Sequence, residues 1–487
     1  MNKERKYPLS SGNGILKIAK KISIVLLLCT ISVGAILSLP HKPCYWQDEF
    51  LAGVAFIGSS SIKEFFTVKN SITPEVAPVY PFLLYTVTNY LHIDPNQFRY
   101  FSVFCMMLCV VFFYLTISKL IEPKTAFLAS ISLSIIPLHL WYSLLLLQHV
   151  LAFLFCTISF YLFSHLIEKE SIKGTDIFLI SFINLLIVLT HYMFFWIPFT
   201  ECLIFLFTKK PTRDRALFIL INIVIVFSTV VHIVVINHKF SIAIPPSKNL
   251  KQTLFTILSV LDFAFISTNS WSVFVQPLFF KHTPMPSWLV SLLYHIPIYI
   301  VIGGNIIVSI LMLWMFFKKL LTIFKKKVVE VDAVFILLIF GIFTPFLFAL
   351  IQVITGSGAL EGRYFYISFA CKLALLYFIV GQIRRRSIRL FLTFVILLFF
   401  IHNYLLYRTC NSYTDWRACV QYLTDEMSKD DIIVGGEFEE VATLNLVWTS
   451  EFNQTKIPPI FYTSSPKSAM EGVSFLQNRF PHSNIWL

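Results

Sequence analysis

Charged residues are scarce in this chain. Asp, Glu, Lys and Arg together make up 13% of its 487 residues, whereas a soluble domain is about one quarter charged. Apolar residues reach 57%, and the mean hydropathy is +0.75. The shortage of charge therefore excludes an ordinary water-soluble globular protein.

Several functional signals are absent as well. The nine cysteines are scattered, and no Cys/His cluster has the spacing of a metal site. The net charge is +13, but no soluble module interleaves basic and aromatic residues, so we expect no nucleic-acid partner. No internal repeat is visible, which disfavours an inverted-repeat transporter. Cys410 and Cys419 could pair in a disulfide, although their spacing alone does not establish one.

Long apolar blocks dominate what is present. A helix needs about 20 residues to cross a bilayer, and in hydrocarbon its backbone groups must pair within the segment. We therefore predict an all-α polytopic membrane protein with about eleven transmembrane helices, and an interfacial helix at Val79–Ile93. The predicted spans are Ile22–Leu39, Phe101–Ile121, Ala126–Leu140, Val150–Ser164, Ile177–Thr190, Phe194–Phe207, Ala216–Ile236, Trp288–Phe317, Val334–Val353, Phe365–Ile383 and Leu390–Tyr404.

Lys and Arg alternate between the connections, and cytoplasmic connections carry the excess of these residues. We expect residues 1–21 to be cytoplasmic, Ile22–Leu39 to be an uncleaved signal anchor, and the C-terminus to lie outside the plasma or inner membrane. The basic connections contain Lys119 and Lys124; Lys169 and Lys173; Lys209, Lys210, Arg213 and Arg215; Lys318, Lys319, Lys325, Lys326 and Lys327; and Arg384, Arg385, Arg386 and Arg389.

The polar segments define the domain organisation. A transmembrane domain over residues 22–404 carries extracytoplasmic loops at 41–99, 238–287 and 355–363, and residues 405–487 form a polar tail. The tail combines a helix-like segment, Asp415–Met427, with strand-like segments at Asp431–Gly436 and Ile457–Ser464. We predict that it folds as a small extracytoplasmic α/β cap.

The acidic pair Asp48–Glu49 is the leading catalytic candidate. It lies just after the first span, beside Trp46 and Phe50, and a partly apolar setting suits a carboxylate to general-base work. The alternative, which the pair taken alone favours, is a solvated acidic pair at a helix start.

Other candidates have ordinary structural alternatives. Arg363, beside Tyr364, lies outside against the positive-inside bias and could bind a phosphate through two parallel hydrogen bonds, or it could reach to the interface. Tyr80 and Arg99 could line a pocket, or serve as interfacial residues. His191, followed by Tyr192, is by itself more typical of a hydrogen-bonded structural histidine, as are His149, His238 and His282.

In their order along the chain, these elements resemble the C-type (GT-C) polyprenyl-phosphate-sugar-dependent glycosyltransferases. The branch in question contains the protein O-mannosyltransferases and the bacterial lipid A aminoarabinose transferases. The similar segments are Asp48–Glu49, Pro78–Tyr85, Arg99, Ile135–Ser143, Thr190–Tyr192, Gly362–Tyr366 and Asp415–Ala418. One segment departs from the family pattern: Leu144–Leu147, Gln148 and His149 stand where many relatives carry Arg and acidic residues.

The resemblance implies an inverting sugar transfer from an undecaprenyl- or dolichyl-phosphate donor to a lipid, glycan or protein acceptor. Asp48, with Glu49, would act as the general base on the acceptor hydroxyl. Arg363, assisted by Lys69 and Lys281, would stabilise the phosphate leaving group. Tyr80, Arg99, His191, Tyr192 and Tyr364 would line the substrate pocket. Some relatives use a divalent metal, for which the sequence offers no clear ligand set.

Three other functions stay open. A lipid-linked saccharide transporter or flippase would place ionisable residues inside spans, and Glu201 and Lys372 are the clearest examples here. A surface-glycan polymerase or ligase would use the same kind of donor. A catalytically silent scaffold is the third alternative. Because polar residues crowd the predicted outer loops rather than the spans, we favour chemistry at the membrane surface.

Overall fold

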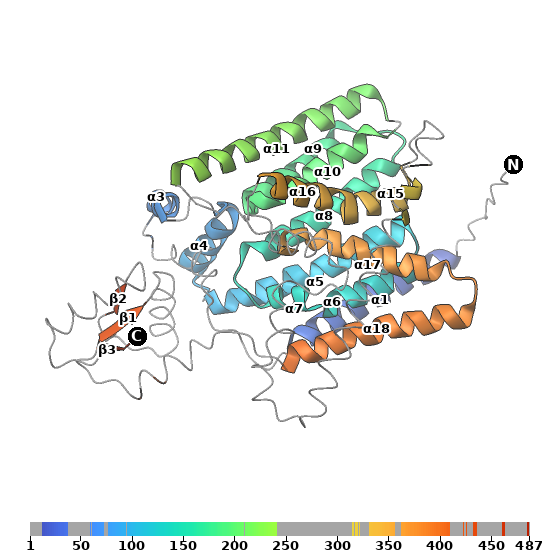
Figure 1. Cartoon of the computed structure of the whole chain (residues 1–487), viewed down its shortest axis with the longest axis horizontal. Helices are drawn as coiled ribbons and strands as arrows, with labels where there is room; N and C mark the ends of the chain where they lie inside the picture. Colours follow the sequence, from blue (N-terminus) through green and yellow to red (C-terminus); the bar gives the residue numbers. More distant parts are fainter. Residues whose placement is uncertain are drawn as a thin grey trace.

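The computed structural model shows a bundle of helices and one short sheet (Figure 1). It describes residues 12–37, 59, 61–72, 76–93, 95–208, 210–240, 331–355 and 362–409, together with the shorter pieces 314–315, 317–319, 321, 422, 425, 432–435, 460–462 and 485–486.

The described helices are numbered in chain order. Their bounds are α1 (Gly12–Leu37), α3 (Ile62–Ile72), α4 (Val79–Leu91), α5 (Pro95–Leu120), α6 (Pro123–Ile135), α7 (Pro137–Ser143), α8 (Gln148–Glu168), α9 (Gly174–Thr190), η2 (Tyr192–Phe195), α10 (Trp196–Leu206), α11 (Thr212–Phe240), α15 (Ala333–Leu338), η4 (Ile339–Phe343), α16 (Thr344–Thr355), η5 (Gly362–Phe365), α17 (Tyr366–Gly381) and α18 (Arg386–Thr409).

Helices α5, α6, α8 and α17 form the centre of the bundle. α5 packs against both α6 and α8, while α17 packs against α6 and η4. The elements α9, α10 and α11 cover one side, and α11 and α18 run along opposite edges in Figure 1. The buried surface between these helices is apolar and rich in aromatic rings, among them Phe113, Phe153 and Phe160.

The described helices are those of a membrane protein. Three stretches are long and apolar enough to cross a bilayer: Gln97–Leu120, Gln148–Glu168 and Thr212–Val235. Shorter apolar helices at 22–37, 174–190, 192–206, 333–348 and 366–381 overlap further predicted spans. α11 exposes apolar side chains such as Leu220 (63%) and Phe227 (67%). Such a continuous apolar face suits lipid rather than water. The count of eleven spans stays a prediction, because most of Trp288–Phe317 lies outside the described residues.

The third predicted span, Ala126–Leu140, is not one continuous helix. α6 ends at Ile135, Ile136 is extended (φ −70°, ψ 143°), and α7 begins at Pro137. A proline disfavours the helical conformation in the residue before it, whereas its own fixed φ suits the first position of a new helix. The break therefore follows from Pro137, and it turns α7 away from the axis of α6.

The tail contains a parallel three-stranded sheet of order β2-β1-β3, with β1 at Ile432–Gly435, β2 at Ile460–Tyr462 and β3 at Ile485–Trp486. Ile433 pairs with Ile460, and Ile432 pairs with Ile485. β1 and β2 lie within the two segments expected to be strands, whereas β3 was not expected. Of the predicted helix Asp415–Met427 only Tyr422 and Asp425 are described, so the α/β cap stays a prediction.

The connections between helices sort onto two ends of the bundle. The basic end contains the turns after α5, α8, α10 and α17. There Lys119 Nζ forms an ion pair with Glu168 Oε2 at 3.0 Å, and Lys210 Nζ donates a hydrogen bond to the carbonyl of Lys169. The site end contains the turns at 136–147, 191–195 and 362–365. Every predicted site residue described in those turns therefore lies far from the basic connections.

Candidate functional site

The structure describes only some of the predicted site residues. Asp48, Glu49 and Lys281 lie outside the described residues. Arg363 is described as part of the single turn η5, without its side chain. Tyr80, Arg99, His191, Tyr192, Tyr364 and Lys69 are described with their side chains. The candidate site is therefore built from these residues and from the neighbours they contact.

Arg99 holds the connection between α7 and α8. Its guanidinium Nη1 donates to the carbonyl of Leu144 at 2.5 Å, and Ser102 one turn later donates to the carbonyl of Leu145 at 2.9 Å. Arg99 is only 6% exposed. This connection contains the segment that departs from the family pattern. Arg99 thus has a structural task there, because a connection without regular structure needs partners for its buried carbonyls.

A histidine pair joins α8 to the end of α9. Nε2 of His149 and Nε2 of His191 lie 3.1 Å apart, and both side chains are buried. His149 also packs on the ring of Tyr142, with centroids 5.1 Å apart. The sequence favoured a structural role for His149, as for His191. Its one distinguishing signal was its place at the end of the departing segment, and only a tertiary contact could connect it to His191.

Tyr364 packs against both histidines. Its ring stacks on His149 at 5.9 Å with an interplanar angle of 17°, and it lies 5.1 Å from His191. Trp196 fixes the backbone of the same residue, since its indole Nε1–H donates to the Tyr364 carbonyl at 3.0 Å. The turn that carries Arg363 is therefore held by residues of α8, α10 and the α9–η2 junction.

Tyr192 and Lys69 form a second part of the site end. The Tyr192 ring meets His232 of α11 at 4.7 Å, and the charge of Lys69 acts on His232 electrostatically. Lys69 lies on α3 and is 3% exposed. Tyr80, on α4, is fully buried and faces the Phe98 ring at 6.2 Å. The structure thus places Tyr192 against α11, whereas Tyr80 packs against the start of α5.

No family model matches this sequence, and no curated protein matches it either. The three-dimensional fold does match solved structures. The crystal structure of the apo oligosaccharyltransferase from Archaeoglobus fulgidus aligns with a TM-score of 0.51 at 12% identity, over 94% of this chain and 68% of that chain. This chain has the GT-C glycosyltransferase fold.

Two further structures align with lower TM-scores. One is the archaeal oligosaccharyltransferase AglB from Archaeoglobus fulgidus in complex with an inhibitory peptide and a dolichol-phosphate (0.47, 12% identity, 89% of this chain and 64% of that chain). The other is ArnT from Cupriavidus metallidurans bound to undecaprenyl phosphate (0.46, 10% identity, 97% and 90%). This chain spans about two thirds of the length of the two oligosaccharyltransferase structures that it matches.

The interior of the helix bundle also contains a polar network. Ser159 of α8 lies 2.7 Å from both Glu201 Oε1 and Asn184 Oδ1, and Asn184 Nδ2 lies 2.6 Å from Glu201 Oε2. All three side chains are fully buried. Glu201, which sequence reasoning left open as a transport residue, is thus bonded within the bundle through both of its oxygens.

The proton count of this network identifies the state of Glu201. Asn222 Nδ2 donates to the backbone carbonyl of Phe218 at 2.9 Å, so its Oδ1 accepts from Asn184 Nδ2 at 2.8 Å. Asn184 Oδ1 therefore faces Ser159 as an acceptor. The single hydroxyl proton of Ser159 serves that contact, so the contact between Ser159 and Glu201 requires a proton on the carboxyl group. We infer that Glu201 is protonated.

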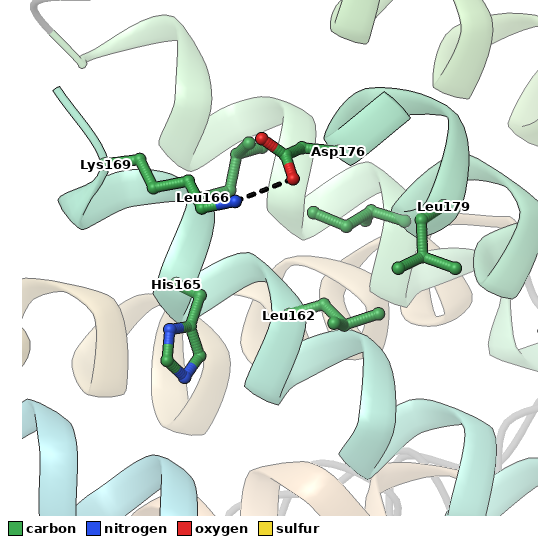
Figure 2. A pocket seen from close by; sticks show the side chains of 7 residues that line it. Leu162, His165, Leu166, Lys169, Asp176 and Leu179 are labelled. Atoms are coloured by element: carbon green, nitrogen blue, oxygen red, sulfur yellow. Dashed lines mark hydrogen bonds and ion pairs between the residues drawn. The ribbon is translucent and has the colours of Figure 1, made fainter. Parts of the chain in front are cut away.

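A small pocket lies at the basic end, between α8 and α9 (Figure 2). Leu162, Leu166 and Leu179 line it, and the ion pair between Lys169 and Asp176, at 2.7 Å, lies across it. Its volume of about 40 Å³ is the size of a site for one or two waters. It is too small for a sugar or a lipid phosphate.

Metal binding has no support in the described part of the chain. There, no three His, Cys, Asp or Glu side chains converge on a point that could hold an ion. The acidic pair Asp48–Glu49 lies outside that part.

Proposed function

We propose that this protein is a membrane glycosyltransferase that moves a hexosyl or pentosyl group from a polyprenyl-phosphate donor to a lipid, glycan or protein acceptor. The observation that carries the proposal is the GT-C fold, which aligns over 94% of the chain. The arrangement of His191, Tyr364 and the Arg363 turn at the end opposite the basic connections supports it. By the positive-inside rule that end is extracytoplasmic.

The proposed reaction is a single inverting displacement. The acceptor hydroxyl loses its proton to Asp48 as its oxygen bonds to the anomeric carbon. The bond between that carbon and the donor phosphate oxygen breaks, and its electron pair stays on the phosphate. Arg363 and Lys69 supply positive charge where this negative charge develops. The polyprenyl chain remains in the bilayer, so the reaction takes place at the membrane surface.

Transport of a lipid-linked saccharide has less support. Ionisable groups on a transport route must be reachable from the moving substrate or ion. Glu201 is instead fully buried and bonded to Ser159 and Asn184. Lys372 is equally buried and lies over the Phe369 ring at 4.9 Å. A surface-glycan polymerase or ligase would share the donor chemistry and is separated from our proposal only by the identity of the acceptor.

The test of the proposal uses the acidic pair. Asp48→Asn keeps the size of the side chain and removes its basicity, so transfer should fall about 100- to 10,000-fold, which is the usual contribution of a general base. Glu49→Gln should cost less if Glu49 assists Asp48. The measurement is release of undecaprenyl phosphate from undecaprenyl-phosphate sugars by purified membranes, followed by mass spectrometry, with lipids, glycans and proteins screened for the added sugar.

The control is equal membrane abundance of the wild type and both variants. If both variants transfer sugar at the wild-type rate, the acidic pair takes no part in the reaction. If the wild-type protein itself releases no undecaprenyl phosphate from any donor, the glycosyltransferase proposal is wrong.

A further inference from the structure

We propose that His149 and His191 act as a neutral hydrogen-bonded pair that positions the turn Gly362–Phe365, and with it Arg363, for the donor phosphate. The inference rests on the proposed function, in which Arg363 binds that phosphate. Both histidines are positioning residues in this proposal, because they contact each other and the ring of Tyr364, which adjoins Arg363.

Hydrogen bonding fixes the tautomer of His191 first. The backbone N–H of Met193 donates to Nδ1 of His191 at 3.3 Å, so that His191 caps the short helix η2. A nitrogen that accepts a hydrogen bond carries no proton, so the ring proton of His191 lies on Nε2. That N–H points to Nε2 of His149, 3.1 Å away.

The tautomer of His149 follows. Because its Nε2 accepts from His191, its own proton lies on Nδ1. If His149 Nε2 also carried a proton, that N–H would face the N–H of His191. If His149 Nε2 were instead the donor, the ring proton of His191 would lie on Nδ1 and would face the N–H of Met193. Both rings are therefore neutral, and each has its one acceptor nitrogen occupied. Neither ring can therefore accept the proton of an acceptor hydroxyl, so the histidine pair does not act as a general base.

The pair acts on Arg363 through Tyr364. The Tyr364 ring contacts His149 at 5.9 Å and His191 at 5.1 Å, and the edge of Phe194 meets the same ring at 6.2 Å with an angle of 90°. Tyr364 is 8% exposed. Arg363 precedes it in a single 3₁₀ turn, so a shift of Tyr364 moves the backbone from which the Arg363 side chain starts. A bidentate phosphate contact depends on that geometry.

Two substitutions of His191 distinguish its hydrogen bond to His149 from its helix-capping bond to Met193. His191→Asn keeps an oxygen where Nδ1 accepts from Met193 but cannot reach His149. His191→Gln places an amide N–H where Nε2 donates to His149 but lacks the cap acceptor. Asn is among the best N-cap residues, which makes this a matched comparison. His165→Asn, at the basic end of α8, is the control for the loss of a histidine without effect on the turn.

The experiment measures binding of undecaprenyl phosphate to the full-length protein in detergent, together with its Tm. We expect His191→Asn to weaken binding about fivefold to tenfold, which corresponds to the loss of one buried hydrogen bond, while its Tm stays close to wild type. We expect His191→Gln to bind as the wild type does and to melt at a lower temperature. Arg363→Ala should lose binding in the same assay.

Each result has a separate meaning. If the wild type does not bind undecaprenyl phosphate, or Arg363→Ala binds it normally, the assignment of Arg363 in the proposed function is wrong. If Arg363→Ala loses binding while His191→Asn binds as the wild type does, that assignment stands and the positioning role is overturned. The positioning role also fails if His191→Asn and His191→Gln weaken binding equally.

Discussion

At the scale of single residues, the two arginines of the site end have different surroundings. The guanidinium of Arg99 is buried and donates to the carbonyl of Leu144, so it stabilises a connection of the chain. Arg363 lies in a turn whose neighbour Tyr364 is held by His149, His191 and Trp196. A fixed backbone suits recognition of a phosphate by the residue that it carries, and we therefore propose that task for Arg363.

Replacing Arg363 tests this assignment. Arg363→Lys keeps the charge but replaces a planar fork by a point charge, so it should still weaken donor binding and transfer. Arg363→Ala should weaken binding about 10- to 150-fold, which corresponds to the loss of charged hydrogen bonds worth about 1.5–3 kcal/mol. Titration with undecaprenyl phosphate and rates of sugar transfer measure both effects. Unchanged turnover in Arg363→Ala membranes would return this residue to an interfacial role.

At the scale of elements, polar side chains fix how four neighbouring helices pack. The network joins α8 through Ser159, α9 through Asn184, α10 through Glu201 and α11 through Asn222. Interhelical hydrogen bonds are a main specific contact between helices in a bilayer, because lipid tails are as apolar as the side chains they replace. The network therefore selects one mutual arrangement of these helices.

The protonated state of Glu201 makes this network testable. In Glu201→Gln the amide N–H can donate to Ser159 while its oxygen accepts from Asn184, so the Tm in detergent should stay close to wild type. Glu201→Leu leaves both partners without a bond, which costs about 1–3 kcal/mol for buried groups in general and about 1–2 kcal/mol at most in membrane bundles. Equal destabilisation of the two variants would mean that Glu201 is ionised.

At the scale of the whole molecule, the two ends of the bundle have opposite chemistry. Lys119, Lys169 and Lys210 meet at the basic end, and the histidine pair and the Arg363 turn lie at the other. We propose that the basic end faces the cytoplasm, as the positive-inside rule predicts, and that the site end faces the lipid-linked donor outside.

A reporter experiment tests this orientation. Alkaline phosphatase, which is active only outside the cytoplasm, should be active when fused after Leu487 and inactive when fused in the connection at Lys210. Green fluorescent protein should give the reverse pattern at both positions. An active cytoplasmic reporter at Leu487 would show that the number of spans is even, or that the orientation is reversed.

The amino-acid sequence by itself determined where most of the described apolar helices lie. Apolar length predicts a helix in hydrocarbon because no other local structure pairs its own backbone there. The positions of α9 and α17 were predicted closely. The continuous span Ala126–Leu140 was wrong, because Pro137 disfavours the helical conformation in Ile136 and so ends α6. The motif residues Arg363, Tyr364 and His191 were also identified as candidates before their neighbours were known.

Only the tertiary structure decided what the polar residues contact. His149 and His191 are 42 positions apart, and Trp196 and Tyr364 are 168 apart. Nothing local relates such residues, because each contact exists only after helices distant in sequence have packed. The same holds for Glu201, whose bonds to Ser159 and Asn184 form only when α8, α9 and α10 pack together. Burial and hydrogen-bond geometry assign these residues their roles, and both are properties of the packed bundle.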